Sequence, residues 1–326
     1  MLALLGHSRN NPCGMQSSHP AVSLEQASRH LGGRVIVDRL DLSLRRGEVL
    51  GLLGINGAGK TTTLRMISGM LAPSSGHVRL GGMDLYEHPR LARRDIGYLP
   101  EDPPLYGELT VAEYLRFCAR LHGLRGAAIQ PAVERAIERC ELGAMRRRLT
   151  SLLSKGFRQR VGLAQSILHE PALIVLDEPA SGLDPIQALR LRELIRNLAD
   201  THAVVLSTHV LSDVLACCDR VAILHEGRLR HSAVLGELDA GCVMHVRIER
   251  EVEHDAWTAM ASVADCQRID ARRWRVTLRE GAGSGELASD INRLGWGLQE
   301  LRPDSNALET IFVGIAGQRV PIEAAA

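Results

Sequence analysis

The chain has 326 residues, of which 45% are hydrophobic and 24% are charged, as in an ordinary soluble globular protein. Its formal net charge of +1 excludes a general electrostatic attraction to nucleic acids or to acidic membrane surfaces. No apolar run approaches the roughly 18 residues of a membrane-spanning helix, and the seven cysteines form no CxxC pair, so we expect reduced, structural thiols.

The first segment, residues 1–20, is polar and irregular, and we expect a flexible tail there. The opening letters MLALLG follow no basic segment, so a secretory signal is not expected. The pattern leaves open whether the chain starts at Met1 or at Met15.

A glycine-rich loop follows a short apolar segment that ends at Leu53, and an apolar-periodic helix follows the loop. The loop fits the pattern GxxxxGK[ST], in which glycines let backbone N–H groups surround phosphate oxygens. Lys60 is expected to reach the β- and γ-phosphates, and the Thr61 hydroxyl to bind Mg²⁺. The predicted phosphate-binding residues are Gly54, Ile55, Asn56, Gly57, Ala58, Gly59, Lys60, Thr61 and Thr62.

The region that follows, about residues 102–165, is mostly helical in pattern. Thr110 and Glu113 have the spacing of a capping box at the start of a helix. Near the end of the region, the stretch LSKGFRQR offers Ser154 as a helix cap, bare backbone at Gly156 and two arginines. This second helix start also suits an anion.

Two further apolar strands end in polar residues. The strand ALIVL leads into Asp177 and Glu178, and the strand HAVVLSTH ends in His209. Because the carboxyl ends of parallel strands share one edge of a sheet, we expect these side chains near the phosphate loop. Asp177 would hold Mg²⁺, Glu178 would take a proton from the attacking water, and His209 would reach the same phosphate. Asp184, in the turn SGLDP, either joins the site or only caps a helix.

A nucleotide that is already held by the phosphate loop has no obvious need of the second anion-binding helix start. The simplest explanation is that it serves the nucleotide of another copy. Two chains would then face each other head to tail, related by a two-fold axis, with two nucleotides between them. Hydrolysis would remove a bridging phosphate and open the dimer.

After about residue 235 the pattern changes. The stretches MHVRIERE and RWRVTLRE alternate like strands, ELASDINRLG reads as a helix, LQELRPDS as a short strand and ALETIFVGIAG as a closing helix. We expect a small α+β unit without a glycine loop or a catalytic pair. Its tryptophans, Trp257, Trp274 and Trp296, are expected to pack in a core rather than to bind a ligand.

The order GINGAGKTT, LSKGFRQR, LIVLDEP, SGLD and STH resembles the ATP-binding subunit of ABC transporters, over roughly residues 20–235. The resemblance implies a P-loop NTPase of the ABC type, an α/β fold with an antiparallel β subdomain and a helical subdomain. It implies that Glu178 and His209 are catalytic and that Thr61, Asp177 and Glu101 hold Mg²⁺. It also implies that Ser154 and Gly156 contact the γ-phosphate of the partner copy and that Asp184 couples the two sites.

The chain departs from the family pattern at several positions. In the motif usually written LSGGQ, Lys155 and Phe157 replace a glycine and the glutamine. The family's lid-loop glutamine aligns with Glu101, which adds a negative charge, so a slower or more Mg²⁺-sensitive reaction is our hypothesis. The family stacks adenine on an aromatic residue, but Leu31 stands at that position, and either His30 stacks instead or base selectivity is relaxed.

The predicted domains are a tail at 1–20, an ATP-binding domain at 21–235 with a helical subdomain at about 102–165, an accessory α+β domain at 236–318 and a tail at 319–326. By resemblance, the helical subdomain meets the permease, near a possible groove at Tyr106, and the accessory domain is regulatory or stabilises the dimer.

We therefore expect an ATPase subunit with ATP and Mg²⁺ as cofactors, driving export through a separate membrane permease. The motifs look most like exporter ATPases such as the gliding-motility and nitrous-oxide-reductase accessory groups. The chain would be cytoplasmic, homodimeric and held at the inner face of the membrane by the permease, with no nucleic-acid partner. The alternative is a soluble clamp ATPase acting on nucleic acid or ribosomes. Work in the maturation of another protein also remains compatible with the motifs.

Overall fold

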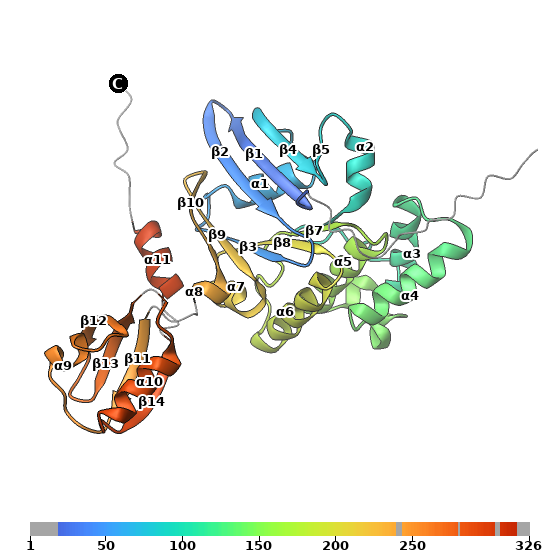
Figure 1. The fold of residues 1–326 in the computed structure, drawn as a ribbon. Helices are drawn as coiled ribbons and strands as arrows, with labels where there is room; N and C mark the ends of the chain where they lie inside the picture. The colour runs from blue at the N-terminus through green and yellow to red at the C-terminus, as the bar shows by residue number, and fades with distance from the viewer. Residues whose placement is uncertain (1–18, 239–242, 280, 304–306, 318–326) are drawn as a thin grey trace, which may run out of the picture.

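The computed structural model describes residues 19–238, 243–279, 281–303 and 307–317. The predicted tails at 1–20 and 319–326 lie almost wholly or wholly outside the described residues, as do Met1 and Met15. Figure 1 shows a larger body of two sheets with helices, and a small domain with a sheet of its own. Among the described residues, no helix is both long enough and apolar enough to cross a bilayer.

A six-stranded sheet forms the centre of the larger body, in the order β10-β9-β3-β8-β7-β6. All neighbouring strands are parallel except β10 against β9. The strands are β3 (Val49–Leu53), β6 (Ile96–Leu99), β7 (Leu173–Leu176), β8 (Ala203–Thr208), β9 (Arg220–His225) and β10 (Arg228–Val234). Every residue of β3, β7 and β8 is buried, as expected for unbroken apolar runs covered on both faces.

An antiparallel sheet covers one face of the central sheet. It has the order β2-β1-β4-β5 and contains β1 (Val22–Leu31), β2 (Arg34–Leu44), β4 (Ser75–Leu80) and β5 (Met83–Asp84). Helix α1 (Lys60–Ile67) packs between the two sheets and contributes Leu64 and Met66 to their common core. This sandwich fixes the start of α1 directly after the phosphate loop.

The other face is covered by helices, which extend into the helical part drawn in green in Figure 1. They are α3 (Val111–Leu121), α4 (Ile129–Arg139), α5 (Lys155–Ile167), α6 (Pro185–Ala199) and α7 (Leu211–Cys217). The predicted capping box is present, because Thr110 accepts from the Glu113 N–H and Glu113 accepts from the Thr110 N–H. Shorter helical segments are α2 (Pro89–Ala92) and 3-10 turns at Arg93–Asp95, Gly126–Ala128, Gly143–Met145 and Thr150–Leu152.

The C-terminal domain is a four-stranded antiparallel sheet in the order β12-β13-β11-β14. Its elements are β11 (Val243–Ile248), α9 (His254–Thr258), β12 (Val263–Arg268), β13 (Arg273–Leu278), α10 (Ser284–Arg293) and β14 (Leu298–Pro303). The three tryptophans lie in its core, with the rings of Trp257 and Trp296 edge to face at 4.9 Å. Their predicted role in packing is confirmed.

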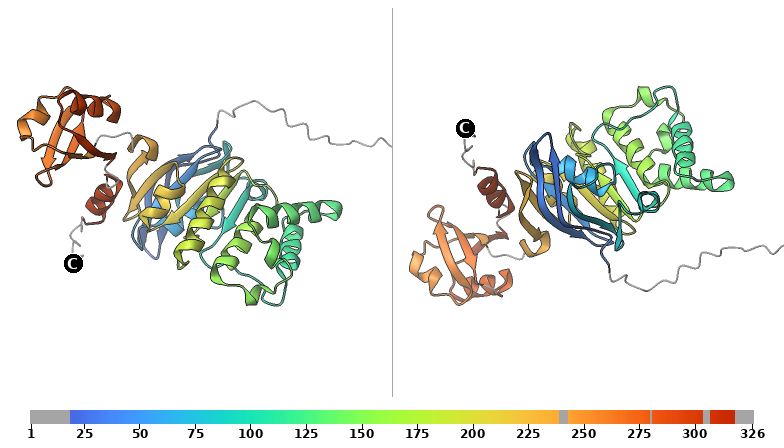
Figure 2. Two further views of the ribbon diagram at one scale, coloured as in Figure 1. Left: turned by 90° about the horizontal axis from the view of Figure 1, so that it is seen from below. Right: turned by 90° about the horizontal axis from the view of Figure 1, so that it is seen from above.

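The last helix, α11 (Ala307–Ala316), packs its apolar side chains against the core of the larger body and contacts β9. Leu308 is buried there, and Ile311, Phe312 and Ile315 lie against the same cluster. A short helix, α8 (Leu235–Leu238), precedes the connection to the small domain. Figure 2 shows α11 between the two bodies, so the chain returns to the larger body after it completes the small sheet. The division of the chain at residue 235 stays a prediction.

Candidate functional site

The phosphate loop is held in a shape that needs glycine at two positions. A side-chain carbon at Gly54 would come 2.6 Å from the Leu224 carbonyl oxygen, and one at Gly59 would come 2.8 Å from the Ile36 carbonyl oxygen. Gly59 also has φ of 100°, in the region that favours glycine. Neighbouring backbone therefore closes around the loop and fixes its path into α1.

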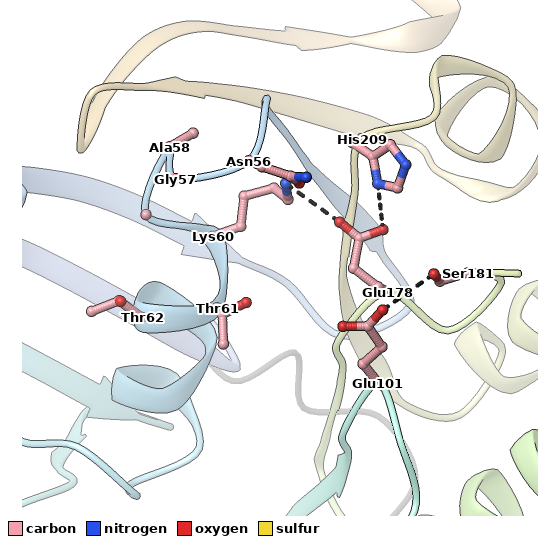
Figure 3. Close-up of a pocket in the computed structure, with 11 residues that line it drawn as sticks. Asn56, Gly57, Ala58, Lys60, Thr61, Thr62, Glu101, Glu178, Ser181 and His209 are labelled. Carbon is pink, nitrogen blue, oxygen red and sulfur yellow. Dashed lines mark hydrogen bonds and ion pairs between the residues drawn. The ribbon is translucent and has the colours of Figure 1, made fainter.

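Lys60 is the first residue of α1 and is only 6% exposed. Its ammonium donates to the Gly54 carbonyl at 2.7 Å and lies 3.3 Å from Glu178 Oε1. The buried ammonium is therefore held at the mouth of the loop, where it faces the acids that follow β7. Figure 3 shows Lys60 and Glu178 pointing toward each other from opposite sides of the pocket.

Asp177 and Glu178 follow β7 directly and separate into different environments. Asp177 is buried, and its Oδ1 accepts from Ser207 at 2.6 Å and from Thr61 Oγ1 at 3.3 Å. Glu178 has φ of 45°, a strained conformation for a residue other than glycine, and its N–H donates to Ser207 Oγ at 2.9 Å. The turn therefore sends the two neighbouring carboxylates to different partners. Burial and the Asp177 carboxylate raise the pKa of Tyr98.

His209 lies one residue past the end of β8 and is half exposed. Its Nδ1 donates to Glu178 Oε2 at 2.9 Å, so both oxygens of Glu178 have a cationic or N–H partner. The backbone at His209 is supported from behind, because Thr208 Oγ1 donates to Asp213 Oδ2 at 2.8 Å and accepts from the Val210 N–H at 3.0 Å. A support of this kind orients the histidine without occupying its ring.

Glu101, two residues past β6, completes the pocket. Its Oε1 accepts from Ser181 Oγ at 3.2 Å, and its backbone carbonyl accepts from Gln159 of α5. The pocket has a volume of 540 Å³. It is lined by Asn56, Gly57, Ala58, Gly59, Lys60, Thr61, Thr62, Glu101, Glu178, Ser181 and His209. Most of the predicted phosphate-site residues thus meet at the carboxyl edge of the central sheet.

Several predicted residues lie outside this pocket. Gly54 and Ile55 form the entry of the phosphate loop, and Asp177 sits behind Thr61. Ser154 is the cap residue of α5 and makes no side-chain capping bond, and Gly156 lies in the first turn of that helix. Asp184 caps α6, because its Oδ1 accepts from the Gln187 N–H at 2.9 Å. In the single chain its side chain therefore acts as a helix cap, the second of the two predicted roles.

Sequence reasoning missed two serines that organise the site. Ser207 bonds to both Asp177 and the Glu178 N–H, and Ser181 bonds to Glu101. A signal for Ser207 was available, because a hydroxyl inside a wholly buried strand needs a polar partner.

His30 and Leu31 are both exposed at the end of β1, and the His30 N–H donates to Ser74 Oγ at 3.1 Å.

The arrangement fits a magnesium nucleotide. Thr61 Oγ1 and Asp177 Oδ1 supply a hydroxyl and a carboxylate oxygen 3.3 Å apart. Mg²⁺ prefers such oxygen donors and commonly takes only one or two from a protein, with phosphates and water as the others. The described residues hold no cluster of three or more His, Cys, Asp or Glu that could bind a metal by itself. The donor set therefore suits an ion that arrives with phosphates.

Comparison with known proteins agrees with this geometry. The family model described as ABC transporter matches residues 37–181. The chain is 36% identical over 219 residues to the probable multidrug ABC transporter ATP-binding protein YbhF of Escherichia coli, which covers 67% of this chain but only 38% of that protein. It is 34% identical over 236 residues to the bacitracin transport ATP-binding protein BcrA of Enterococcus faecalis, covering 72% of this chain and 74% of that protein.

A solved structure described as the ATP binding subunit of an ABC transporter superposes with a TM-score of 0.60 at 32% identity. The match covers 67% of this chain and 91% of that chain. The predicted α/β P-loop architecture is confirmed by this likeness and by the sheet order. The chain belongs to the family of ATP-binding proteins of ABC transporters.

Proposed function

We propose that this chain binds and hydrolyses ATP as the energy-supplying subunit of an ABC transporter, and that it drives export through a separate membrane permease. The observation that carries the proposal is the pocket in which Lys60, Glu178 and His209 meet beside Thr61 and its partner Asp177. A positioned carboxylate next to a phosphate loop is the arrangement that hydrolysis of a nucleoside triphosphate requires.

In the proposed reaction, the loop from Gly54 to Thr62 holds the phosphates through its backbone N–H groups, and Lys60 neutralises their charge. Glu178 takes the proton of the attacking water, and His209 holds its carboxylate in place through the 2.9 Å bond. Thr61, Asp177 and Glu101 are the proposed protein ligands of Mg²⁺, which supplies charge neutralisation at the transferred phosphoryl group.

The proposed active form is a head-to-tail homodimer with ATP at the interface. Ser154, Gly156 and Asp184 do not line the pocket of their own chain, although the family pattern gives them phosphate-facing roles. The Ser154 hydroxyl makes no capping bond to its helix, which leaves it able to bind an external anion. A two-fold dimer would bring these residues to the nucleotide of the second copy.

A groove on the helical part supports a membrane partner. It has a volume of 340 Å³ and is lined by Pro104, Leu105, Tyr106, Tyr114, Phe117, Cys118, Leu121 and Gln165. Tyr106 is 53% exposed and Leu121 is 71% exposed. We propose that a cytoplasmic helix of the permease occupies this groove, so that the chain lies at the inner face of the cell membrane.

The names of the two relatives favour export, because one is named for multidrug transport and the other for bacitracin transport. Within the exporters, we retain the gliding-motility and nitrous-oxide-reductase accessory type as the proposed group, on the strength of the LSKGFRQRVGLA and GYLPED stretches. The accessory domain at 236–318 is proposed to regulate or stabilise the dimer.

Replacement of Glu178 by Gln tests the ATPase assignment. The amide keeps the size of the side chain but cannot accept a proton, so we expect hydrolysis to fall on the order of 10²–10⁴-fold. The same variant should form a dimer with ATP that persists in gel filtration. Unchanged turnover would overturn the assignment of the base.

Copurification from detergent extracts tests the transport role. A partner with several membrane spans is expected to accompany the Glu178→Gln protein when ATP is present. Ribosomes or DNA in its place would favour the soluble clamp ATPase over the transporter subunit.

A further inference from the structure

Glu101 lies in a segment that has little support of its own. Residues 100–109 run between β6 and α3 without a helix or a strand, and the Glu101 side chain is exposed. The Glu101 backbone carbonyl accepts a hydrogen bond from Nε2 of Gln159, a residue of α5. Within the described ranges, no other hydrogen bond reaches the Glu101 backbone. The position of Glu101 at the pocket therefore depends on what joins it to α5.

Helix α5 lies directly against both flanks of Glu101. A side-chain carbon at Gly162 of α5 would come 2.5 Å from the Leu99 side chain and 2.8 Å from the Pro103 ring. Leu99 comes shortly before Glu101 in the sequence, and Pro103 comes shortly after it. Because Gly162 has no side chain, the helix comes close enough for Gln159, less than one turn earlier, to reach the Glu101 carbonyl.

The two polar atoms of the Gln159 amide differ in their contacts. Gln159 is only 1% exposed, and its Nε2 donates to the Glu101 carbonyl. Within the described part of the chain, its Oε1 is buried and accepts no hydrogen bond. Burying an unpaired polar atom costs free energy, which an apolar side chain of the same length would avoid. What the amide contributes at this position is therefore its N–H group.

The carboxylate of Glu101 has a contact of its own on the pocket side. Its Oε1 accepts from Ser181 Oγ at 3.2 Å, and the Ser181 N–H donates to the Glu178 carbonyl at 3.0 Å. Figure 3 shows Glu101 turned toward Ser181 in the pocket. Glu101 is thus held at two points. Gln159 joins its backbone to α5, and Ser181 joins its carboxylate to the turn that follows the proposed base.

We propose that Gln159 is a positioning residue for the hydrolysis reaction, and that its N–H group holds the backbone of Glu101 where the carboxylate can reach Mg²⁺. The inference rests on the proposed role of Glu101 as a Mg²⁺ ligand. Gln159 is not among the residues that line the pocket, so it acts through Glu101 and not on the nucleotide. Loss of the N–H group should let the segment around Glu101 move and weaken its hold on the metal.

The first test measures amide hydrogen exchange of residues 100–109 without nucleotide. Gln159→Met removes the N–H group and keeps a long unbranched side chain, and we expect this segment to exchange faster than in the parent protein. Ser166→Ala is the matched control, because Ser166 is a buried polar residue of the same helix whose hydroxyl donates to the Leu163 carbonyl at 2.8 Å. In the control, exchange of residues 100–109 should match the parent protein.

The second test measures the Mg²⁺ concentration that gives half-maximal binding of a fluorescent ATP analogue. It uses the Glu178→Gln background, in which hydrolysis is expected to be slow. We expect Gln159→Met to raise this concentration by up to about threefold, the change expected when Glu101 itself loses its charge. Combining Gln159→Met with Glu101→Gln should raise it no further than Glu101→Gln alone, because a positioning residue acts through the group that it positions.

Other results would overturn the proposal in distinguishable ways. Parent-like exchange of residues 100–109 in Gln159→Met would show that the bond does not hold the segment. Multiplicative effects of Gln159→Met and Glu101→Gln on the Mg²⁺ requirement would assign Gln159 to the packing of α5. An unchanged requirement in Gln159→Met, where Glu101→Gln raises it, would refute the positioning role alone. If Glu101→Gln itself left the requirement unchanged, the proposed metal ligand would be refuted, and with it the role of Gln159. Gln159→Leu repeats both tests if the Met variant does not fold.

Discussion

Ser207 is the residue whose removal is expected to disturb the site most without touching a predicted catalytic or ligand-binding residue. It is wholly buried, and its hydroxyl donates to Asp177 Oδ1 at 2.6 Å while it accepts from the Glu178 N–H at 2.9 Å. Ser207→Ala deletes both bonds and leaves a buried N–H without a partner. A hydrogen bond to a charged group contributes about 1.5–3 kcal/mol and an unsatisfied buried donor costs about 1–3 kcal/mol.

Because these two contributions overlap, we expect the free energy of unfolding to fall by about 2–4 kcal/mol. Glu178 is strained at φ of 45°, and its N–H bond to Ser207 helps to hold that conformation. A carboxylate displaced by about 1 Å costs on the order of 10²-fold in rate, so kcat for ATP should fall by that factor.

The assays are urea unfolding followed by circular dichroism and phosphate release measured across a range of Mg²⁺ concentrations. Ser166→Ala is the matched control, because Ser166 is also wholly buried but donates only to the Leu163 carbonyl of its own helix, at 2.8 Å. The control should lose less than about 1 kcal/mol and keep its turnover. If Ser207→Ala behaved like Ser166→Ala in both assays, the bond to Asp177 would not organise the site.

Two further predictions follow from Glu101 and His169. Glu101→Gln should hydrolyse ATP faster at saturating Mg²⁺ and need more Mg²⁺ for the half-maximal rate. Each change should be on the order of threefold, or about 0.7 kcal/mol, the effect of removing one screened charge. Rates that match the parent protein at every Mg²⁺ concentration would contradict this prediction. Burial lowers the pKa of His169 to about 4, and its ring stacks on His122 at 3.9 Å. Because its pKa is lowered, His169 stays neutral in the folded protein at pH values where it is protonated in the unfolded chain. The contribution of His169 to stability is therefore complete above the unfolded pKa of about 6.5 and is lost as the pH falls toward 4. Between pH 7.5 and pH 5 the loss should reach up to about 2 kcal/mol in urea unfolding, and His169→Phe should reduce it, whereas equal pH profiles would exclude His169 as the cause.

The pocket was predictable from sequence because each of its main side chains follows an apolar strand. Lys60, Glu178 and His209 come after β3, β7 and β8, and parallel strands end at one edge of the sheet. The positions of these three residues along the sequence, each after a parallel strand, therefore already implied that their side chains lie close together. Ser207 was missed because it lies within the apolar run of β8, where its partner depends on the register that sets Leu206 opposite Leu176.

Other features depend on packing that local pattern does not specify. The C-terminal strands β11, β13 and β14 alternate clearly, but β12 carries Val263 and Cys266 inward with a shift of register between them, and it was not predicted. The apolar face of α11 was visible in the sequence, yet nothing there indicates that it packs against the larger body. The hydrogen bond from Gln159 to Glu101 likewise depends on how α5 meets the segment after β6.

The contacts of Glu178 bear on the order of events in the proposed reaction. Lys60 lies 3.3 Å from one carboxylate oxygen and His209 donates to the other, so both oxygens of the proposed base have partners before substrate arrives. Phosphate oxygens compete with that carboxylate for Lys60, since the same ammonium serves both. Substrate binding that draws Lys60 away breaks this contact, while the bond from His209 still orients the carboxylate. The same contact implies that the effects of changing Lys60 and Glu178 are coupled, because each is the other's ion-pair partner before catalysis.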